Sequence, residues 1–159
     1  MNEVYLLTGS NIGNAHQHLQ QALQAIHTIA GNVVTQSSVY RTAPWGNKAQ
    51  DDFLNQVLKV NTTLQPDELM EALLSIEQQM GRVRTVPNAP RIIDIDILFY
   101  NQLVYQSTLV EVPHPRLHLR RFVLQPLCEL VPDLMHPVWH KTIRQLLAEC
   151  TDTGLVEKM

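Results

Sequence analysis

Two amphipathic segments constrain the fold of this chain more than any other feature of its sequence. Apolar residues recur at spacings of four, three and four between residues 16 and 30, and again between residues 66 and 80. They are Leu19, Leu23, Ile26 and Ala30 in the first segment and Leu69, Leu73, Ile76 and Met80 in the second. This periodicity predicts two helices, each with one apolar face to bury.

Four β-like stretches alternate with these helices in a definite order. Strands are predicted at Val4–Thr8, Val33–Arg41, Gln56–Thr63 and Asp94–Tyr100. The order strand, helix, strand, strand, helix, strand predicts a ferredoxin-like α+β sandwich. Residues 101–159 predict a C-terminal extension with a short hairpin, Pro-bounded turns and helices, the last of them around Thr142–Cys150.

Length and composition narrow the class of protein. The 159 residues suit a single domain spanning 1–159. A net charge of −3 and a pI near 6.1 argue against a general nucleic-acid binder. There is no basic, apolar leader, no apolar run of membrane-spanning length and no cysteine framework. We therefore expect a cytoplasmic monomer that acts on small molecules and binds neither nucleic acid nor membrane.

The segment from Arg91 to Phe99 carries the clearest chemical signal. Alternation along a strand puts Ile95, Ile97 and Phe99 on a core face and Asp94 and Asp96 together on the other. Two carboxylates roughly 7 Å apart, about two strand rises, can each hold a Mg²⁺ and share ligands between the ions. The alternative is a half-exposed strand whose outer face is acidic by chance, and Asp-x-Asp by itself is a weak motif.

Nearby arginines strengthen the metal interpretation. Arg82, Arg84 and Arg91 lie within ten positions of one another, just before the two aspartates. The planar guanidinium group of one arginine can bind two phosphate oxygens at once. In the alternative interpretation they only form salt bridges with Asp94 and Asp96. Three cations facing two carboxylates would leave an excess of positive charge, and this favours a site that holds both metal ions and phosphates.

Other motifs carry less information. The stretch from Gly9 to Asn14 lacks the spacing of a phosphate-binding glycine loop and predicts a tight turn. His114 lies between two prolines, which restrict where its ring can point, and a structural or a functional role is equally open. Phe53 and Phe122 are predicted as core aromatics, and Asn55 as a cap or a ligand donor.

Six short motifs together resemble the 6-hydroxymethyl-7,8-dihydropterin pyrophosphokinase (HPPK) family of the folate pathway, collinearly from about Val4 to Pro132. They are Gly9-Ser10-Asn11, Ser37–Thr42, Phe53-Leu54-Asn55, Glu77–Arg84, Pro90–Asp96 and Val112-Pro113-His114. The resemblance implies a ferredoxin-like fold and a transferase that uses ATP, two Mg²⁺ ions and the pterin alcohol, and that releases AMP.

The resemblance also implies roles for individual residues. Asp94 and Asp96 are the expected metal ligands, and together with Arg82 and Arg91 they form the expected catalytic group. The expected ATP contacts are Glu77, Arg82, Arg84, Arg91, His114 and Arg120. Phe53 and Phe122 are expected to enclose the pterin, Asn55 to bind its edge, and the backbone from Thr42 to Trp45 to complete its hydrogen bonds. The chain departs from the family pattern between Arg84 and Arg91, where the loop is one residue shorter and lacks a Trp.

Two other functions compete with this hypothesis. Palm-like nucleotidyl transferases and cyclases also place metal-binding carboxylates on ferredoxin-like sheets, but the low pI and the phenylalanine pair favour a small flat substrate. A non-catalytic ligand-sensing module of the same topology would not need the aspartates and the arginines.

Overall fold

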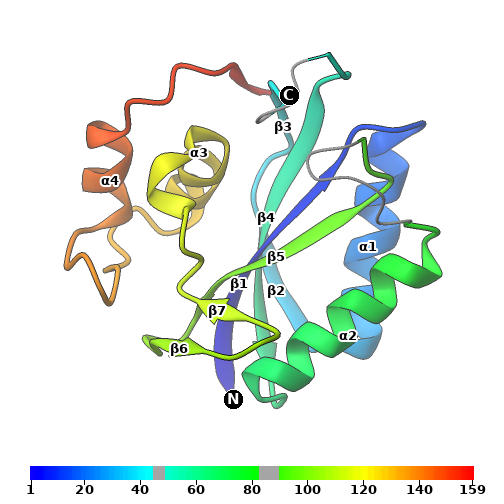
Figure 1. Cartoon of the computed structure of the whole chain (residues 1–159), viewed down its shortest axis with the longest axis horizontal. Helices are drawn as coiled ribbons and strands as arrows, with labels where there is room; N and C mark the ends of the chain where they lie inside the picture. Colours follow the sequence, from blue (N-terminus) through cyan, green and yellow to red (C-terminus); the bar gives the residue numbers. More distant parts are fainter. Residues whose placement is uncertain (45–48, 83–89) are drawn as a thin grey trace.

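An antiparallel sheet lies between two layers of helices (Figure 1). The computed structural model describes residues 1–44, 49–82 and 90–159. Its elements are β1 (Asn2–Ser10), α1 (Ala15–Ile29), β2 (Asn32–Gln36), β3 (Tyr40–Thr42), β4 (Phe53–Thr62), α2 (Pro66–Gln79), β5 (Asp94–Tyr100), β6 (Tyr105–Gln106), β7 (Glu111–Val112), a 3₁₀ turn (Leu117–Leu119), α3 (Arg121–Leu130), α4 (Ile143–Glu149) and β8 (Val156–Lys158). The strand order is β5-β1-β4-β3-β8, with β2 also paired to β4. The predicted ferredoxin-like arrangement is confirmed.

The sheet has a hydrophobic core on each face. Helices α1 and α2 cover one face, and α3 and α4 cover the other (Figure 1). On the first face Leu6 and Leu58 pack with Ile26 and Leu73. On the second face Leu7 packs with Leu124. Because β1 and β4 contribute buried residues to both cores, they fix the position of everything attached to the sheet.

The two predicted helices form where their periodicity places them. The Asn14 side chain caps α1 by accepting a hydrogen bond from the Gln17 backbone N–H at 3.1 Å. Helix α2 begins at Pro66, whose missing N–H is tolerated in the first turn, and it ends before Gly81, which has a φ of 93°. Among the described residues, no helix is long and apolar enough to span a membrane.

The prediction of one strand over Val33–Arg41 is wrong, because the chain leaves the ladder between β2 and β3. Ser37 takes over the hydrogen bonds at this break. Its hydroxyl accepts the N–H of Val57 at 2.9 Å, and its carbonyl accepts from the Gln56 side chain at 2.8 Å. Side-chain bonds of this kind compete with a regular ladder. The break turns β3 toward the cavity described below.

The predicted position of Phe99 is also wrong. The pairing of β1 with β5 shifts by one residue between Tyr5 and Leu6, so that Tyr5 opposes Phe99 and Leu6 opposes Ile97. This irregularity moves Phe99 to the face of α3 and α4, opposite to Ile95 and Ile97. The two aspartates precede the shift and are unaffected by it.

Two elements of the C-terminal extension have no clear sequence signal. Helix α3 contains Pro126, which disfavours a helix in a pattern-based prediction. Strand β8 is only three residues long and pairs antiparallel with β3. The predicted hairpin is confirmed as β6 and β7, and the predicted last helix is confirmed as α4, which Thr142 caps.

Acid is expected to destabilise the protein through His136. This side chain is 2% exposed, and its Nδ1 accepts N–H bonds from Val138 and Trp139, both at 3.1 Å. Burial, followed by the charges of His118 and His140, lowers the pKa of His136 to about 4. The folded state therefore favours neutral His136, and this contribution is complete above pH 6.5 and lost as the pH falls toward 4.

The expected loss is at most about 3–4 kcal/mol, since the pKa falls from 6.5 to about 4 and each pKa unit corresponds to about 1.36 kcal/mol, and it is measured by urea unfolding at a series of pH values. The His136→Gln variant should be less stable overall, but its unfolding free energy should fall less steeply between pH 6.5 and 4. Equal slopes for the variant and the wild type would show that His136 does not contribute.

Candidate active site

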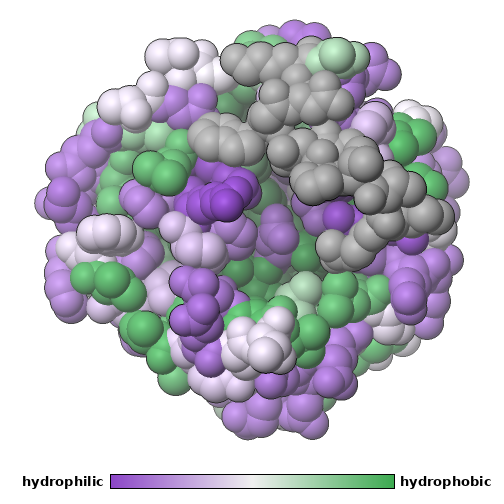
Figure 2. Space-filling view, in the orientation of Figure 1, coloured by the Kyte–Doolittle hydropathy of each residue, from purple (hydrophilic) through white to green (hydrophobic). Residues whose placement is uncertain are grey.

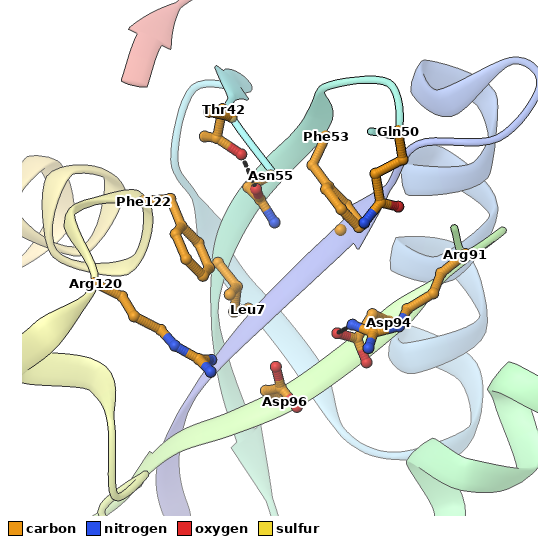
Figure 3. Close-up of a pocket in the computed structure, with 12 residues that line it drawn as sticks. Leu7, Thr42, Gln50, Phe53, Asn55, Arg91, Asp94, Asp96, Arg120 and Phe122 are labelled. Carbon is orange, nitrogen blue, oxygen red and sulfur yellow. Dashed lines mark hydrogen bonds and ion pairs between the residues drawn. The ribbon is translucent and has the colours of Figure 1, made fainter. Parts of the chain in front are cut away.

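A cavity opens on the face of the sheet that carries α3 (Figure 3). Figure 2 shows strongly hydrophilic residues near the middle of this side of the molecule, where the surface is hollowed. The predicted site residues that line the cavity are Thr42, Phe53, Asn55, Arg91, Asp94, Asp96, Arg120 and Phe122. They come from β3, β4, β5, α3 and the segments just before β5 and α3, so the fold brings together residues that are far apart in sequence.

Asp94 and Asp96 lie on the same face of β5, as the alternation predicts. Asp94 pairs in register with Gly9 of β1, and Asp96 pairs with Leu7. All four residues line the cavity, and Figure 3 shows both carboxylates directed into it. Two carboxylates thus face one cavity from neighbouring positions on one strand.

Two of the arginines predicted to bind phosphates, Arg82 and Arg91, contact Asp94 in this structure. Arg82 donates to one carboxylate oxygen of Asp94 at 2.7 Å, and Arg91 donates to the other at 3.0 Å. Both Asp94 oxygens are therefore occupied by guanidinium groups. The salt-bridge interpretation of Arg82 and Arg91 thus holds at Asp94 in this structure.

Glu77 of α2 stabilises the cluster of Arg82, Arg91 and Asp94 through its buried carboxylate. Its carboxylate is 2.8 Å from the Arg82 guanidinium and accepts the backbone N–H of Ile95, also at 2.8 Å. The Glu77 side chain is 3% exposed and that of Arg82 is 8% exposed. Glu77 therefore fixes both Arg82 and the β5 backbone between the two aspartates.

Asp96 lies in an electrostatically unfavourable place for a free carboxylate. Burial, followed by the negative charge of Asp94, raises the pKa of Asp96 to about 7 against the opposing positive charge of Arg120. Across the site, burial and the charge of Arg120 lower the pKa of His114 to about 4. A cation bound beside Asp96 would keep its carboxylate ionised.

The donor set fits Mg²⁺. Within the described ranges, no group of three or more His, Cys, Asp or Glu side chains is placed to enclose a metal. Mg²⁺ commonly binds through one or two carboxylates and completes its shell with water and substrate phosphates. Asp94 and Asp96 are two carboxylates of the kind that such a partial shell requires.

The other half of the cavity is a slot between aromatic side chains. Phe53 on β4 and Phe122 on α3 both line the cavity, and Figure 3 shows them on opposite sides of Asn55. The Arg120 guanidinium lies 5.5 Å from the centroid of the Phe122 ring. A flat, partly polar ring is the shape of ligand that such a slot accommodates.

Asn55 is held in one orientation at the base of this slot. Its side-chain oxygen accepts from the Thr42 hydroxyl at 2.6 Å, and its nitrogen donates to the Thr8 carbonyl at 3.3 Å. The structure places the Thr42 side chain, 1% exposed, behind Asn55. The Thr8 carbonyl can only accept a hydrogen bond, so it holds the amide nitrogen on its own side, and the Thr42 hydroxyl then donates to the amide oxygen.

Leu7, Gly9 and Gln50 also line the cavity, and sequence reasoning missed them. Gly9 was predicted to lie in a turn, but it belongs to β1 and pairs with both Asn55 and Asp94. The missed signal is the alternation of β1, which puts Leu7 and Gly9 on one face. No sequence pattern identifies Gln50.

Alanine at position 9 is expected to weaken binding of a ligand in the slot by about tenfold or more. A Cβ on Gly9 would lie 2.5 Å from the Asn55 side-chain nitrogen, so Asn55 must move. A small displacement of a positioning group is enough for such a loss. Calorimetry with a pterin should detect it, while affinity for MgATP should change little. Unchanged pterin affinity would contradict the placement of Asn55 in the binding site.

His114 does not line the main cavity. It lines another groove beside β6 and β7, where its backbone N–H donates to the Leu98 carbonyl at 2.9 Å and its Nδ1 accepts from the Arg116 N–H at 3.1 Å. Two other predicted site residues, Trp45 and Arg84, lie outside the described residues.

Comparison with known proteins gives consistent matches. The sequence model of the 7,8-dihydro-6-hydroxymethylpterin-pyrophosphokinase (HPPK) family matches residues 5–132. The 2-amino-4-hydroxy-6-hydroxymethyldihydropteridine pyrophosphokinase of Methylorubrum extorquens is 40% identical over 156 residues, which are 98% of each chain. The corresponding protein of Bacillus subtilis is 42% identical over 130 residues, 81% of this chain and 78% of that protein.

Other relatives are much longer than this chain. The folic acid synthesis protein fol1 of Schizosaccharomyces pombe is 43% identical over 152 residues, which are 95% of this chain but 21% of that protein. The chain likewise spans 24% of its Dictyostelium discoideum relative. A structure of Plasmodium falciparum HPPK-DHPS superposes with a TM-score of 0.74 at 18% identity, covering 94% of this chain and 43% of that one. The last likeness concerns the fold alone.

The fold and the cavity together define an α+β protein of ferredoxin-like architecture, with paired carboxylates, arginines and an aromatic slot on one face of the sheet. The family match covers most of the chain, and a bacterial relative aligns with it from end to end. The chain belongs to the HPPK family.

Proposed function

We propose that this chain is a 2-amino-4-hydroxy-6-hydroxymethyldihydropteridine diphosphokinase of folate biosynthesis. It transfers a diphosphate from ATP to 6-hydroxymethyl-7,8-dihydropterin and releases AMP and the pterin diphosphate. The observation that carries the proposal is the single cavity in which two aspartates of one strand adjoin arginines and a slot lined by two phenylalanines. One part suits metal and phosphates, and the other suits a flat ring.

The acidic and basic residues act on the nucleotide in this proposal. Asp94 and Asp96 hold two Mg²⁺ ions, which neutralise the charge of the triphosphate when bound. Arg82, Arg91 and Arg120 bind phosphate oxygens and stabilise the charge that develops as AMP leaves. The further nucleotide contacts proposed from the family are Glu77, Arg84 and His114.

The aromatic slot acts on the acceptor. Phe53 and Phe122 stack on the pterin, while Asn55, held by Thr8 and Thr42, binds its polar edge. The backbone from Thr42 to Trp45 is proposed to complete the hydrogen bonds to the ring. The new bond joins the hydroxymethyl oxygen to the β-phosphorus as the bond to AMP breaks. Because the slot adjoins the aspartates, positioning of the two substrates supplies much of the rate.

The test is an assay of nucleotide products with ATP, Mg²⁺ and the pterin alcohol. AMP formed in equal amount to the pterin diphosphate supports the proposal. Formation of pyrophosphate would indicate a nucleotidyl transferase or cyclase, and ADP would indicate a different kinase. Pterin binding without turnover would favour a sensing module.

The finer biological setting is part of the same proposal. We propose that residues 1–159 act as one pyrophosphokinase domain, monomeric and cytoplasmic, with small-molecule substrates and without nucleic-acid or membrane partners. The end-to-end match with the bacterial relative supports the single domain. The net charge of −3 supports the exclusion of nucleic acid. Light scattering of the purified chain tests whether it is a monomer.

A further inference from the structure

Asn11, directly after the end of β1, makes an unusually complete set of hydrogen bonds. It is 7% exposed. Its backbone N–H donates to the Arg91 carbonyl at 3.0 Å, and its side-chain oxygen accepts the Arg91 N–H at 2.8 Å. Its side-chain nitrogen donates to the Gln50 side-chain oxygen at 2.8 Å and to the Asp51 carbonyl at 3.0 Å. One buried amide thus links two chain segments that are about 40 residues apart.

These two segments serve different halves of the cavity. Gln50 lines the cavity and lies in the lead-in to β4, three residues before Phe53 of the aromatic slot. Arg91 lies three residues before Asp94 and binds its carboxylate. Figure 3 shows Gln50 and Arg91 on the same side of the cavity, with Phe53 beside the first and Asp94 beside the second.

Asn11 lies just beyond the last backbone pairs that connect β1 to its two neighbouring strands, β4 and β5. The ladder of β1 ends at Ser10, which pairs with Leu54 of β4, and Gly9 is the last β1 residue paired with β5. Beyond these pairs, the side chain of Asn11 connects the residues just before β4 to the residues just before β5. A side-chain amide suits this task because it accepts on one side and donates twice on the other.

We propose that Asn11 is a positioning residue that holds the ring slot and the phosphate side of the active site in a fixed relation. The inference rests on the proposed function and extends it. The acceptor arm of Asn11 positions Arg91, and its donor arm positions residues 50–51 and the approach to Phe53. Because phosphoryl transfer requires the attacking oxygen to be aligned with phosphorus, a small relative shift of the two halves slows the reaction.

The two arms can be tested separately by substitution. Asn11→Asp keeps an oxygen that accepts the Arg91 N–H but loses the donor toward Gln50 and Asp51. It should raise KM for the pterin about tenfold and leave KM for ATP within about twofold. Asn11→Ala loses both arms and should raise both KM values about tenfold. The control is Asn14→Ala, which removes the cap of α1 and should lower stability without changing either KM.

Hydrogen exchange measured by mass spectrometry gives a readout that does not depend on catalysis. Exchange around Arg91 should accelerate in Asn11→Ala and stay near the wild-type rate in Asn11→Asp, whereas exchange at residues 50–52 should accelerate in both. The inference is overturned if Asn11→Asp changes the two KM values equally, if the loss of activity in both variants is no larger than their loss of folded enzyme, or if exchange at the two segments does not separate. Absence of AMP release by the wild type would overturn the proposed function, and the exchange pattern would still decide whether Asn11 positions the two segments.

Discussion

Replacement of Asp96 by alanine should reduce AMP release on the order of 1,000-fold while the fold persists. The side chain faces the cavity from β5, beside Asp94, and supplies half of the proposed carboxylate pair. Its removal takes away a ligand whose effect on transition-state charge is of this size in other enzymes. The measurement is AMP production at saturating ATP and pterin, with thermal unfolding as the check on folding.

The free energy of unfolding should distinguish this loss of AMP release from a loss of folded protein. Burial and the charge of Asp94 make ionised Asp96 unfavourable, as its raised pKa shows, so its loss should not lower the unfolding free energy by more than about 1 kcal/mol. Asp96→Asn should behave in the same way. Asp133→Ala is the control, because Asp133 pairs with Arg144 on the exposed surface. Near wild-type turnover in Asp96→Ala would refute the metal assignment.

Replacement of Glu77 by alanine should lower the unfolding free energy by about 3–5 kcal/mol. The carboxylate is buried, pairs with the buried Arg82 guanidinium and accepts the Ile95 N–H. Its loss removes one partner of a buried charge pair and a hydrogen bond inside β5. At 2–4 °C per kcal/mol for a chain of this size, the midpoint of thermal unfolding should fall by roughly 10 °C.

A variant on the same helix provides the control for Glu77. Glu71 is exposed on α2, and Glu71→Ala should change stability by less than about 0.5 kcal/mol. Glu77→Gln should lie between the two because it keeps an oxygen for the Ile95 N–H. A loss below about 1 kcal/mol in Glu77→Ala would mean that Asp94 alone is a sufficient partner for Arg82, and that Glu77 does not hold the cluster.

The parts of the fold that sequence predicted are those with a regular signal over several turns or residues. Helices α1 and α2 each repeat a full apolar face, and β5 alternates cleanly through its two aspartates. Such repeats depend on local geometry alone, so no tertiary information is needed to find them.

The remaining elements depend on contacts that a linear pattern does not contain. The break at Ser37 requires Val57 and Gln56 as partners, and β8 exists because β3 offers it an edge. The displaced position of Phe99 comes from a register shift against β1, which alternation within β5 cannot indicate.

The candidate site likewise has parts that the sequence predicts and parts that depend on the folded structure. Asp94 and Asp96 could be predicted from one strand, and the aromatic slot came from resemblance to a family. The attachment of Arg82 to Glu77 and the linking role of Asn11 could not, because each joins segments whose separation is set only by the folded sheet.

Arg82 and Arg91 both form ion pairs with Asp94, and under the proposed function this has a thermodynamic consequence. Triphosphate and carboxylate compete for the same two guanidinium groups, so nucleotide that draws the arginines away exposes an anionic ligand for the cation. The affinities for nucleotide and for Mg²⁺ must then increase each other by the same factor, since coupling between two ligands is reciprocal. Under the proposed function, Arg82 and Arg91 neutralise Asp94 until the nucleotide binds, and Mg²⁺ then takes their place.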